Sequence, residues 1–145
     1  MTMFADGYII KTDRKYDGKS IDPKAFSDCD GKYVPVVWNV DNMDSSNILG
    51  KAHLTVKPDG VYAIITFSHN KQAECAWELG KNGDVNSLIA VVNNVLYANE
   101  RIISGNIYQV SFNLKGCITE PCIFSNTTFT EIYCCEMLRC YGDTY

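Results

Sequence analysis

The stretch from Gly50 to Phe67, GKAHLTVKPDGVYAIITF, decides the fold class. Ala52, Leu54 and Val56 alternate with polar neighbours, which is the period-two pattern of a strand with one buried face. Pro58-Asp59-Gly60 supplies the residue types of a tight turn between two such runs. The stretch is therefore predicted to form a β-hairpin, with strands at 50–57 and 60–67.

Short apolar runs on both sides of this hairpin predict further strands, at 4–11, 33–39, 87–96, 101–104, 106–114 and 122–125. Gly105 is expected to separate the strand at 101–104 from the strand at 106–114. Helical spacing of apolar residues predicts one helix at 71–79, and a helical turn is expected at 23–27. Many short strands with few helices favour a mainly β fold, a closed or nearly closed β-barrel with one or two short helices.

The length of 145 residues favours one domain that is large enough to bury a core. Residues 1–126 are expected to form the barrel. Residues 127–145 are expected to form a short C-terminal segment packed on the same domain. The pattern in this segment fits either a helix or a strand.

The composition is typical of a globular protein, with 46% apolar and 21% charged residues. The net charge is −4 and the basic residues are dispersed along the chain, so no nucleic-acid partner is expected. No run of about 18 apolar residues is present, and the N-terminus lacks the pattern of a signal peptide. No membrane association is expected.

The chain has seven cysteines, but no Cys-x-x-Cys pair and no histidine at a zinc-site spacing. We expect free thiols that pack as small apolar residues, and we expect no metal and no cofactor. A metal cluster of Cys117, Cys122, Cys134 and Cys135 stays open as an alternative, as do disulfides.

Five segments occur in an order and spacing that are informative together: VPVVWNVD (34–41), LGKAHL (49–54), DGVYA (59–63), GDVNSLIA (83–90) and GNIYQVS (105–111). This series resembles the phage prohead protease family, over about Phe4 to Ile123. Members are serine proteases that process capsid precursors. The resemblance implies a barrel like that of the herpesvirus assembly protease.

The family positions for the catalytic histidine, the nucleophilic serine and the acidic residue correspond here to Val40, Ile89 and Gln109. A hydroxyl nucleophile needs an adjacent base that a third group orients. None of these three side chains can take its role. The resemblance therefore implies a catalytically degenerate member, a pseudoprotease rather than an enzyme.

Three residues are candidates to replace the missing groups. His53 is expected on the solvent side of its strand, and His69 in a turn after the strand that ends at Phe67. Ser87 would share the face of Ile89, but about 6.6 Å away along the strand, which is too far for catalysis. We expect all three to be structural.

The functional hypothesis is a virion structural protein, a decoration or auxiliary head protein on the capsid surface. It would be made in the bacterial cytoplasm and bind the major capsid protein of a phage head, with self-association on the lattice. The sequence does not assign the interface. Two alternatives stay open: an active or cryptic serine maturation protease, and a counter-defence protein that binds a host factor or a small ligand. For the latter, Val40, Ile89 and Trp38 would line an apolar cleft.

Overall fold

The computed structural model describes residues 2–15, 18–38, 48–83, 85–114, 129–134 and 139–142, with side chains left out at 85–87, 113–114 and 129–134. Most of these residues lie in strands, so the predicted mainly β class is confirmed. The strands are β1 (Met3–Lys11), β2 (Ser20–Ile21), β3 (Tyr33–Trp38), β4 (Ile48–Lys57), β5 (Gly60–Phe67), β6 (Val85–Ala98), β7 (Arg101–Leu114), β8 (Phe129–Cys134) and β9 (Arg139–Gly142). The helices are η1, a 3-10 turn at Ser27–Cys29, and α1 (Lys71–Lys81).

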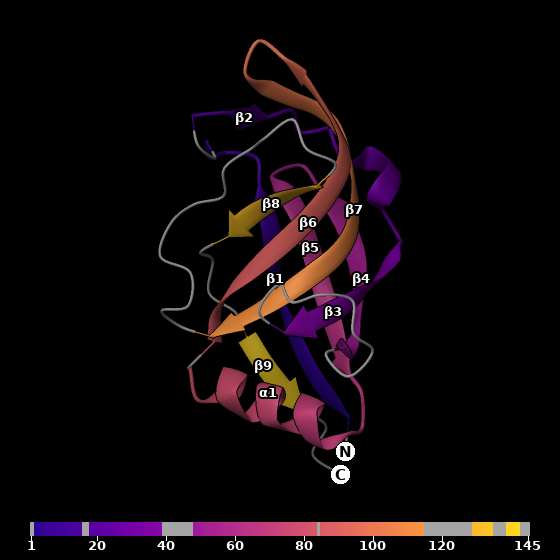
Figure 1. The fold of residues 1–145 in the computed structure, drawn as a ribbon, viewed down its shortest axis with the longest axis vertical. Helices are drawn as coiled ribbons and strands as arrows, with labels where there is room; N and C mark the ends of the chain where they lie inside the picture. Colours follow the sequence, from indigo (N-terminus) through magenta and orange to yellow (C-terminus); the bar gives the residue numbers. More distant parts are fainter. Residues whose placement is uncertain are drawn as a thin grey trace.

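One sheet contains all nine strands, in the order β8-β6-β7-β3-β4-β5-β1-β9, with β2 paired to β7. The sheet curls, so that β6 and β8 approach β1, as the ribbon shows (Figure 1). Among the described residues, however, no hydrogen-bonded pairing joins β8 to β1 or to β9. The short β9 instead occupies the edge of β1 from Met3 to Asp6. The sheet is therefore open, and the closed barrel of the prediction is not supported.

The inner surface of the curled sheet holds the main core, in which Phe67 packs edge-on against Phe112 with ring centroids 5.4 Å apart. Helix α1 lies across one end of the sheet (Figure 1). Asn70 caps its N-terminus by accepting a hydrogen bond from the Ala73 amide at 2.8 Å. The indole of Trp77 donates to the Phe4 and Tyr141 carbonyls, which fastens the helix to β1 and β9.

Local predictions agree with the structure where the pattern is strong. The hairpin of β4 and β5 and helix α1 lie where the sequence places them. Gly105 does not break a strand, because β7 runs through it without interruption. A side chain at this position would meet the Phe26 ring at 2.8 Å, so glycine is needed for packing rather than for a turn. The predicted strand at 122–125 lies outside the described residues.

The C-terminal segment contributes strands where the sequence pattern left helix and strand open. β8 pairs with β6, and β9 pairs with β1. Both strands therefore extend the sheet. In the part of the chain that the structure describes, α1 is the longest helix, and no helix has the length and apolar character needed to cross a bilayer.

Candidate functional site

Two of the three positions that match the family triad lie close together. Ile89 in β6 and Gln109 in β7 are on the same face of neighbouring strands, where Ile89 is opposite Ser111 and Gln109 is opposite Val91. Ile89 is fully buried and Gln109 is 4% exposed. Val40 lies outside the described residues. Because an isoleucine cannot act as a nucleophile and an amide does not titrate, this pair supplies no proton-transfer chemistry.

The residues considered as replacements are not assembled around this pair. His53 lies on β4 and Ile89 lies on β6. Strands β7 and β3 lie between these two strands, so the two residues are roughly 14 Å apart across the sheet. The ring of His53 is 4.8 Å from that of Tyr33. His69 lies beyond the end of β5, next to α1. Ser87 is in β6 as predicted, but its side chain is not described.

The apolar cleft that the sequence suggests is not formed by the residues described. Trp38 packs toward the main core, with its ring 6.1 Å from that of Phe112. Leu88 and Ala90 also belong to this core, so the side chain of Ile89 between them points to the other face of the sheet. Trp38 and Ile89 therefore cannot line one cleft together.

The cysteines show no ligand cluster in the described part of the chain. Cys29 is buried, Cys75 is exposed and Cys140 is partly buried, and all three are free thiols. Burial raises the pKa of Cys140 to about 11. Cys117, Cys122 and Cys135 lie outside the described residues, and Cys134 is described by its backbone in β8 alone, so the proposed cluster is not tested.

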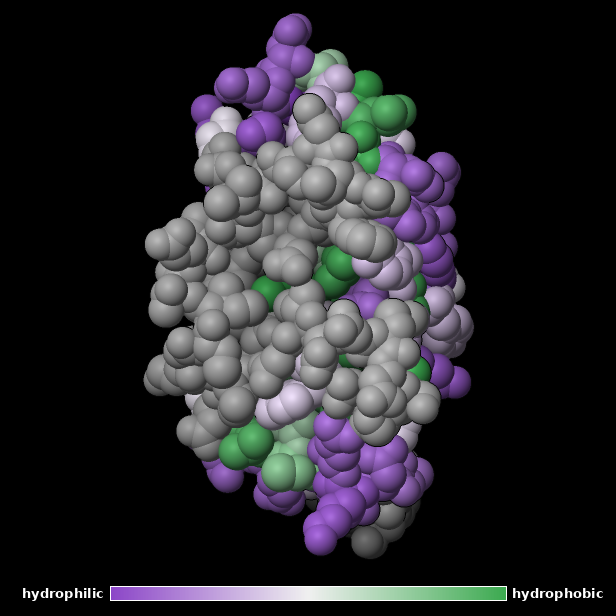
Figure 2. Space-filling model, in the orientation of Figure 1, coloured by the Kyte–Doolittle hydropathy of each residue, from purple (hydrophilic) through white to green (hydrophobic). Residues whose placement is uncertain are grey.

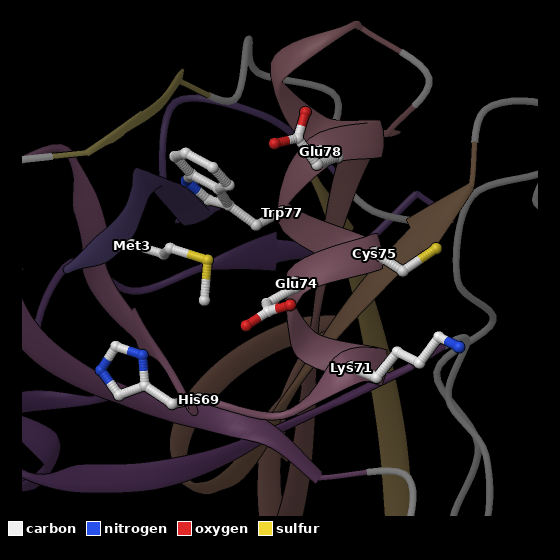
Figure 3. A pocket seen from close by; sticks show the side chains of 7 residues that line it. All are labelled: Met3, His69, Lys71, Glu74, Cys75, Trp77 and Glu78. Carbon is white, nitrogen blue, oxygen red and sulfur yellow. The ribbon is translucent and has the colours of Figure 1, made fainter. Parts of the chain in front are cut away.

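A surface pocket of about 560 Å³ lies beside α1, lined by Met3, His69, Lys71, Glu74, Cys75, Trp77 and Glu78. Figure 3 shows Glu74 on the side of the helix that faces Met3 and His69. Lys71 and Cys75 point away on the other side, so the thiol and the imidazole do not face each other (Figure 3). A cysteine nucleophile needs a neighbouring base, and these positions do not provide one.

The hairpin of β6 and β7 extends beyond the rest of the sheet, and we call residues 93–106 the arm (Figure 1). Its turn residues Asn99 and Glu100 have φ of 50° and 62°, as in the turns whose twist suits a hairpin. Leu96 is 58% exposed and Ile103 is 43% exposed. Hydrophobic residues are visible at the surface at the level of the arm (Figure 2). These two side chains are the exposed large apolar residues of the arm among the residues described, and they are its candidates for contact with a partner.

Contacts from other elements hold the arm in place. β2 pairs in parallel with Arg101 and Ile102, and Arg101 Nη2 is 3.1 Å from Asp22 Oδ2. At the base of the arm, Lys32 Nζ donates to Asn106 Oδ1 at 2.6 Å. These contacts restrict the orientation of the arm before any partner binds, which reduces the entropic cost of binding.

A second surface is formed by the outer side chains of β3, β4, β5, β1 and β9. The register of these strands aligns the side chains in rows across the sheet. One row contains Tyr33, His53, Ile64, Asp6 and Arg139; the next contains Pro35, Lys51, Thr66, Phe4 and Tyr141; a third contains Thr55, Tyr62 and Tyr8. We call this surface, together with Lys11 and Lys57 at its end, the aromatic face.

Rings on the aromatic face occur in three contacting pairs: Phe4 with Tyr141 at 5.4 Å, Tyr8 with Tyr62 at 5.0 Å, and Tyr33 with His53 at 4.8 Å between centroids. Each pair has a cation near a ring. The cation-to-centroid distances are 5.8 Å for Arg139 at Tyr141, 4.3 Å for Lys11 at Tyr8, 4.4 Å for Lys57 at Tyr62 and 5.4 Å for Lys51 at Tyr33.

Two carboxylates moderate the charge of this face. Asp6 is 5% exposed and accepts both hydrogen bonds of the Arg139 guanidinium, at 2.9 and 2.6 Å, which raises the pKa of Arg139. A hydrogen bond from Lys11 at 3.2 Å lowers the pKa of Asp59. Burial, and then the charge of Asp6, raise the pKa of Tyr62. Four cations against two anions leave the face net positive in a chain of net charge −4.

The sequence pattern contained part of the signal for this face. Alternation predicts that Lys51, His53 and Lys57 point outward from one strand. Nothing in the sequence places them beside Tyr33 or Arg139, because those contacts depend on strand order and register. Four of the 13 Lys and Arg residues, which are dispersed along the chain, are therefore brought together on one surface.

Comparisons with known protein families, with curated proteins and with solved structures found no match. The resemblance to prohead proteases and the catalytic roles that it implies stay predictions.

Proposed function

We propose that the protein is a non-enzymatic structural component of a phage particle, which binds the major capsid protein on the surface of the head. The observation that carries this proposal is the arm, a braced projection with Leu96 and Ile103 exposed at its surface. A preorganised apolar projection suits insertion between the subunits of a partner. Self-association on the lattice would follow from the repeat of the capsid surface.

The chemistry of the family positions supports the non-enzymatic part of the proposal. Ile89 is fully buried, and Gln109 beside it has no ionisable group. We also propose that the curled sheet is a relative of the barrel of the herpesvirus assembly protease. The approach of β6 and β8 to β1 supports this, and the open edge is the feature in which the two would differ.

A capsid-binding assay with variants of the arm tests the function. Purified phage heads that lack the protein are mixed with the parent chain or with the double variant Leu96→Asp and Ile103→Asp, and bound protein is measured after sedimentation. The double variant should bind at least about tenfold more weakly, because two charges would be placed in an apolar contact. The single variant Leu96→Asp is compared with Ile64→Asp, a control that adds the same charge at a site 39% exposed on the aromatic face.

A mass-spectrometric inventory of mature particles tests the localisation. Full-length chain at a copy number that is a simple fraction of the major capsid protein is the expected result. Particles without the protein, from cells that express it abundantly, would favour a counter-defence role instead. Cleavage of a capsid precursor by the purified chain would favour the maturation protease.

A further inference from the structure

We propose that the aromatic face binds single-stranded nucleic acid, with bases stacking on its exposed tyrosines and phosphates contacting Lys51 and Lys57. This inference goes beyond the proposed function and does not depend on it. The two proposals use different surfaces, since the capsid contact is assigned to the arm and the nucleic acid to the outer side of β3, β4, β5, β1 and β9.

The aromatic side chains are the first part of the argument. Tyr33 is 62% exposed and Tyr141 is 40% exposed, and both rings are held by a neighbouring ring, His53 and Phe4 respectively. An exposed ring that is already fixed in position is suited to stack a base, because little side-chain freedom is lost on binding. Single-stranded segments offer unpaired bases for such stacking, whereas the bases of a duplex are already stacked.

Spacing is the second part. Tyr33 on β3 and Tyr141 on β9 are separated by four strand intervals, which is roughly 19 Å across the sheet. A few extended nucleotides span such a distance, at the lower end of the site sizes of about 4–16 nucleotides known for small barrel domains. Between the two tyrosines, Lys51 and Thr66 occupy the row that contains Tyr141, so a backbone crossing the strands would pass over a cation and a hydroxyl.

Charge is the third part. The net charge of −4 opposes binding of an anion at long range, but interactions beyond about 10 Å are screened at ordinary ionic strength. The local balance on the face is four cations against two anions, and both anions are engaged, Asp6 by Arg139 and Asp59 by Lys11. Lys51 and Lys57 have no carboxylate partner among the contacts described. They are the cations that we assign to phosphate.

Fluorescence anisotropy with a labelled twelve-nucleotide oligothymidine at about 50 mM salt tests the proposal. The plot of log affinity against log salt should have a slope of about −1.4, as for two neutralised phosphates on a single strand, one each for Lys51 and Lys57. The double variant Lys51→Glu and Lys57→Glu should bind more weakly and flatten this slope. Lys24→Glu with Lys81→Glu is the matched control for the change in net charge, because Lys81 also lies over a ring, Trp77, but on helix α1.

Stacking is tested separately from charge. Tyr33→Ala should raise Kd by about 5- to 150-fold, the range observed when a stacking ring is removed, whereas Tyr33→Phe should retain most of the affinity. Leu96→Ala on the arm should leave the affinity unchanged. A DNA duplex of the same length should bind at least tenfold more weakly than the single strand.

Three results would overturn the proposal: no anisotropy change up to about 100 µM protein, an affinity for duplex or for a poly-glutamate peptide equal to that for the single strand, or a Tyr33→Ala variant that binds like the parent. The last two would indicate a surface for acidic polymers in general. Capsid binding is tested with variants of the arm, and nucleic-acid binding with variants of the aromatic face. The two proposals can therefore fail independently of each other.

Discussion

Replacing Ile89 with serine tests whether the position that the prohead-protease resemblance aligns with a nucleophile is part of the packing. Ile89 is fully buried in β6, between β7 and β8. Removal of most of a buried isoleucine side chain costs about 2–5 kcal/mol, and a buried hydroxyl adds to this unless it finds a partner. Ser111 lies directly opposite and can provide one. We therefore expect Ile89→Ser to lower the free energy of unfolding by about 2 to 4 kcal/mol.

Urea denaturation followed by tryptophan fluorescence is the assay. The free energy of unfolding falls by about 2 kcal/mol per M of urea for a domain of this size, so the urea concentration at the unfolding midpoint should fall by roughly 1 to 2 M. Ile89→Val should cost about 0.5–1.5 kcal/mol. Isoleucine is replaced with serine at an exposed site in the control, Ile103→Ser. The free energy of unfolding of this variant should stay within about 0.5 kcal/mol of that of the parent. An Ile89→Ser variant as stable as the parent would refute the reasoning, because it would mean that the site is open to water.

Four further predictions follow from the same structure. Iodoacetamide at pH 8 should label Cys75 well before Cys140, because Cys75 is exposed and the pKa of Cys140 is raised to about 11. The contribution of the protonated Cys140 thiol to the free energy of unfolding should be complete below pH 9 and should be lost as the pH rises through about 11. Asn70→Ala should lower stability by about 1 kcal/mol in urea, through loss of the helix cap. Asp6→Asn should cost about 1 kcal/mol in the same assay, since the solvent-exposed Arg139 guanidinium can be hydrated when its partner is removed. Val40→His, Ile89→Ser and Gln109→Glu together should give no measurable peptidase, because the new serine would be buried; turnover of a fluorogenic peptide by this variant would show the opposite.

Elements defined by nearby residues were predictable from the sequence. The β4–β5 hairpin follows from alternation and the Pro58-Asp59-Gly60 turn, and α1 follows from its apolar spacing. Gly105 was interpreted wrongly because the reason for the glycine is the ring of Phe26, which is distant in sequence. Whether the sheet closes into a barrel could not be predicted from local sequence patterns either, because closure depends on which strand pairs with the edge of β1.

The candidate site divides in the same way. Ile89 and Gln109, which the resemblance aligns with two family positions, lie on the same face because they are in strands that pair directly. The resemblance could not show that Trp38 and Ile89 face opposite sides of the sheet, because this depends on how β3 pairs with β7 and β7 with β6: Trp38 is opposite Phe112, whereas Ile89 is opposite Ser111.

The aromatic face shows most clearly what register adds to composition. Four cations are few among the 13 Lys and Arg residues of an acidic chain, and in sequence they lie far apart, at Lys11, Lys51, Lys57 and Arg139. A shift of one residue in the pairing of β4 would turn Lys51 and Lys57 toward the core, and the same shift in β1 would turn Lys11. The buried alternation of Ala52 and Leu54 opposes such a shift, so the same residues that build the core also fix the cations on the outside. The charge pattern of this surface is thus a consequence of core packing.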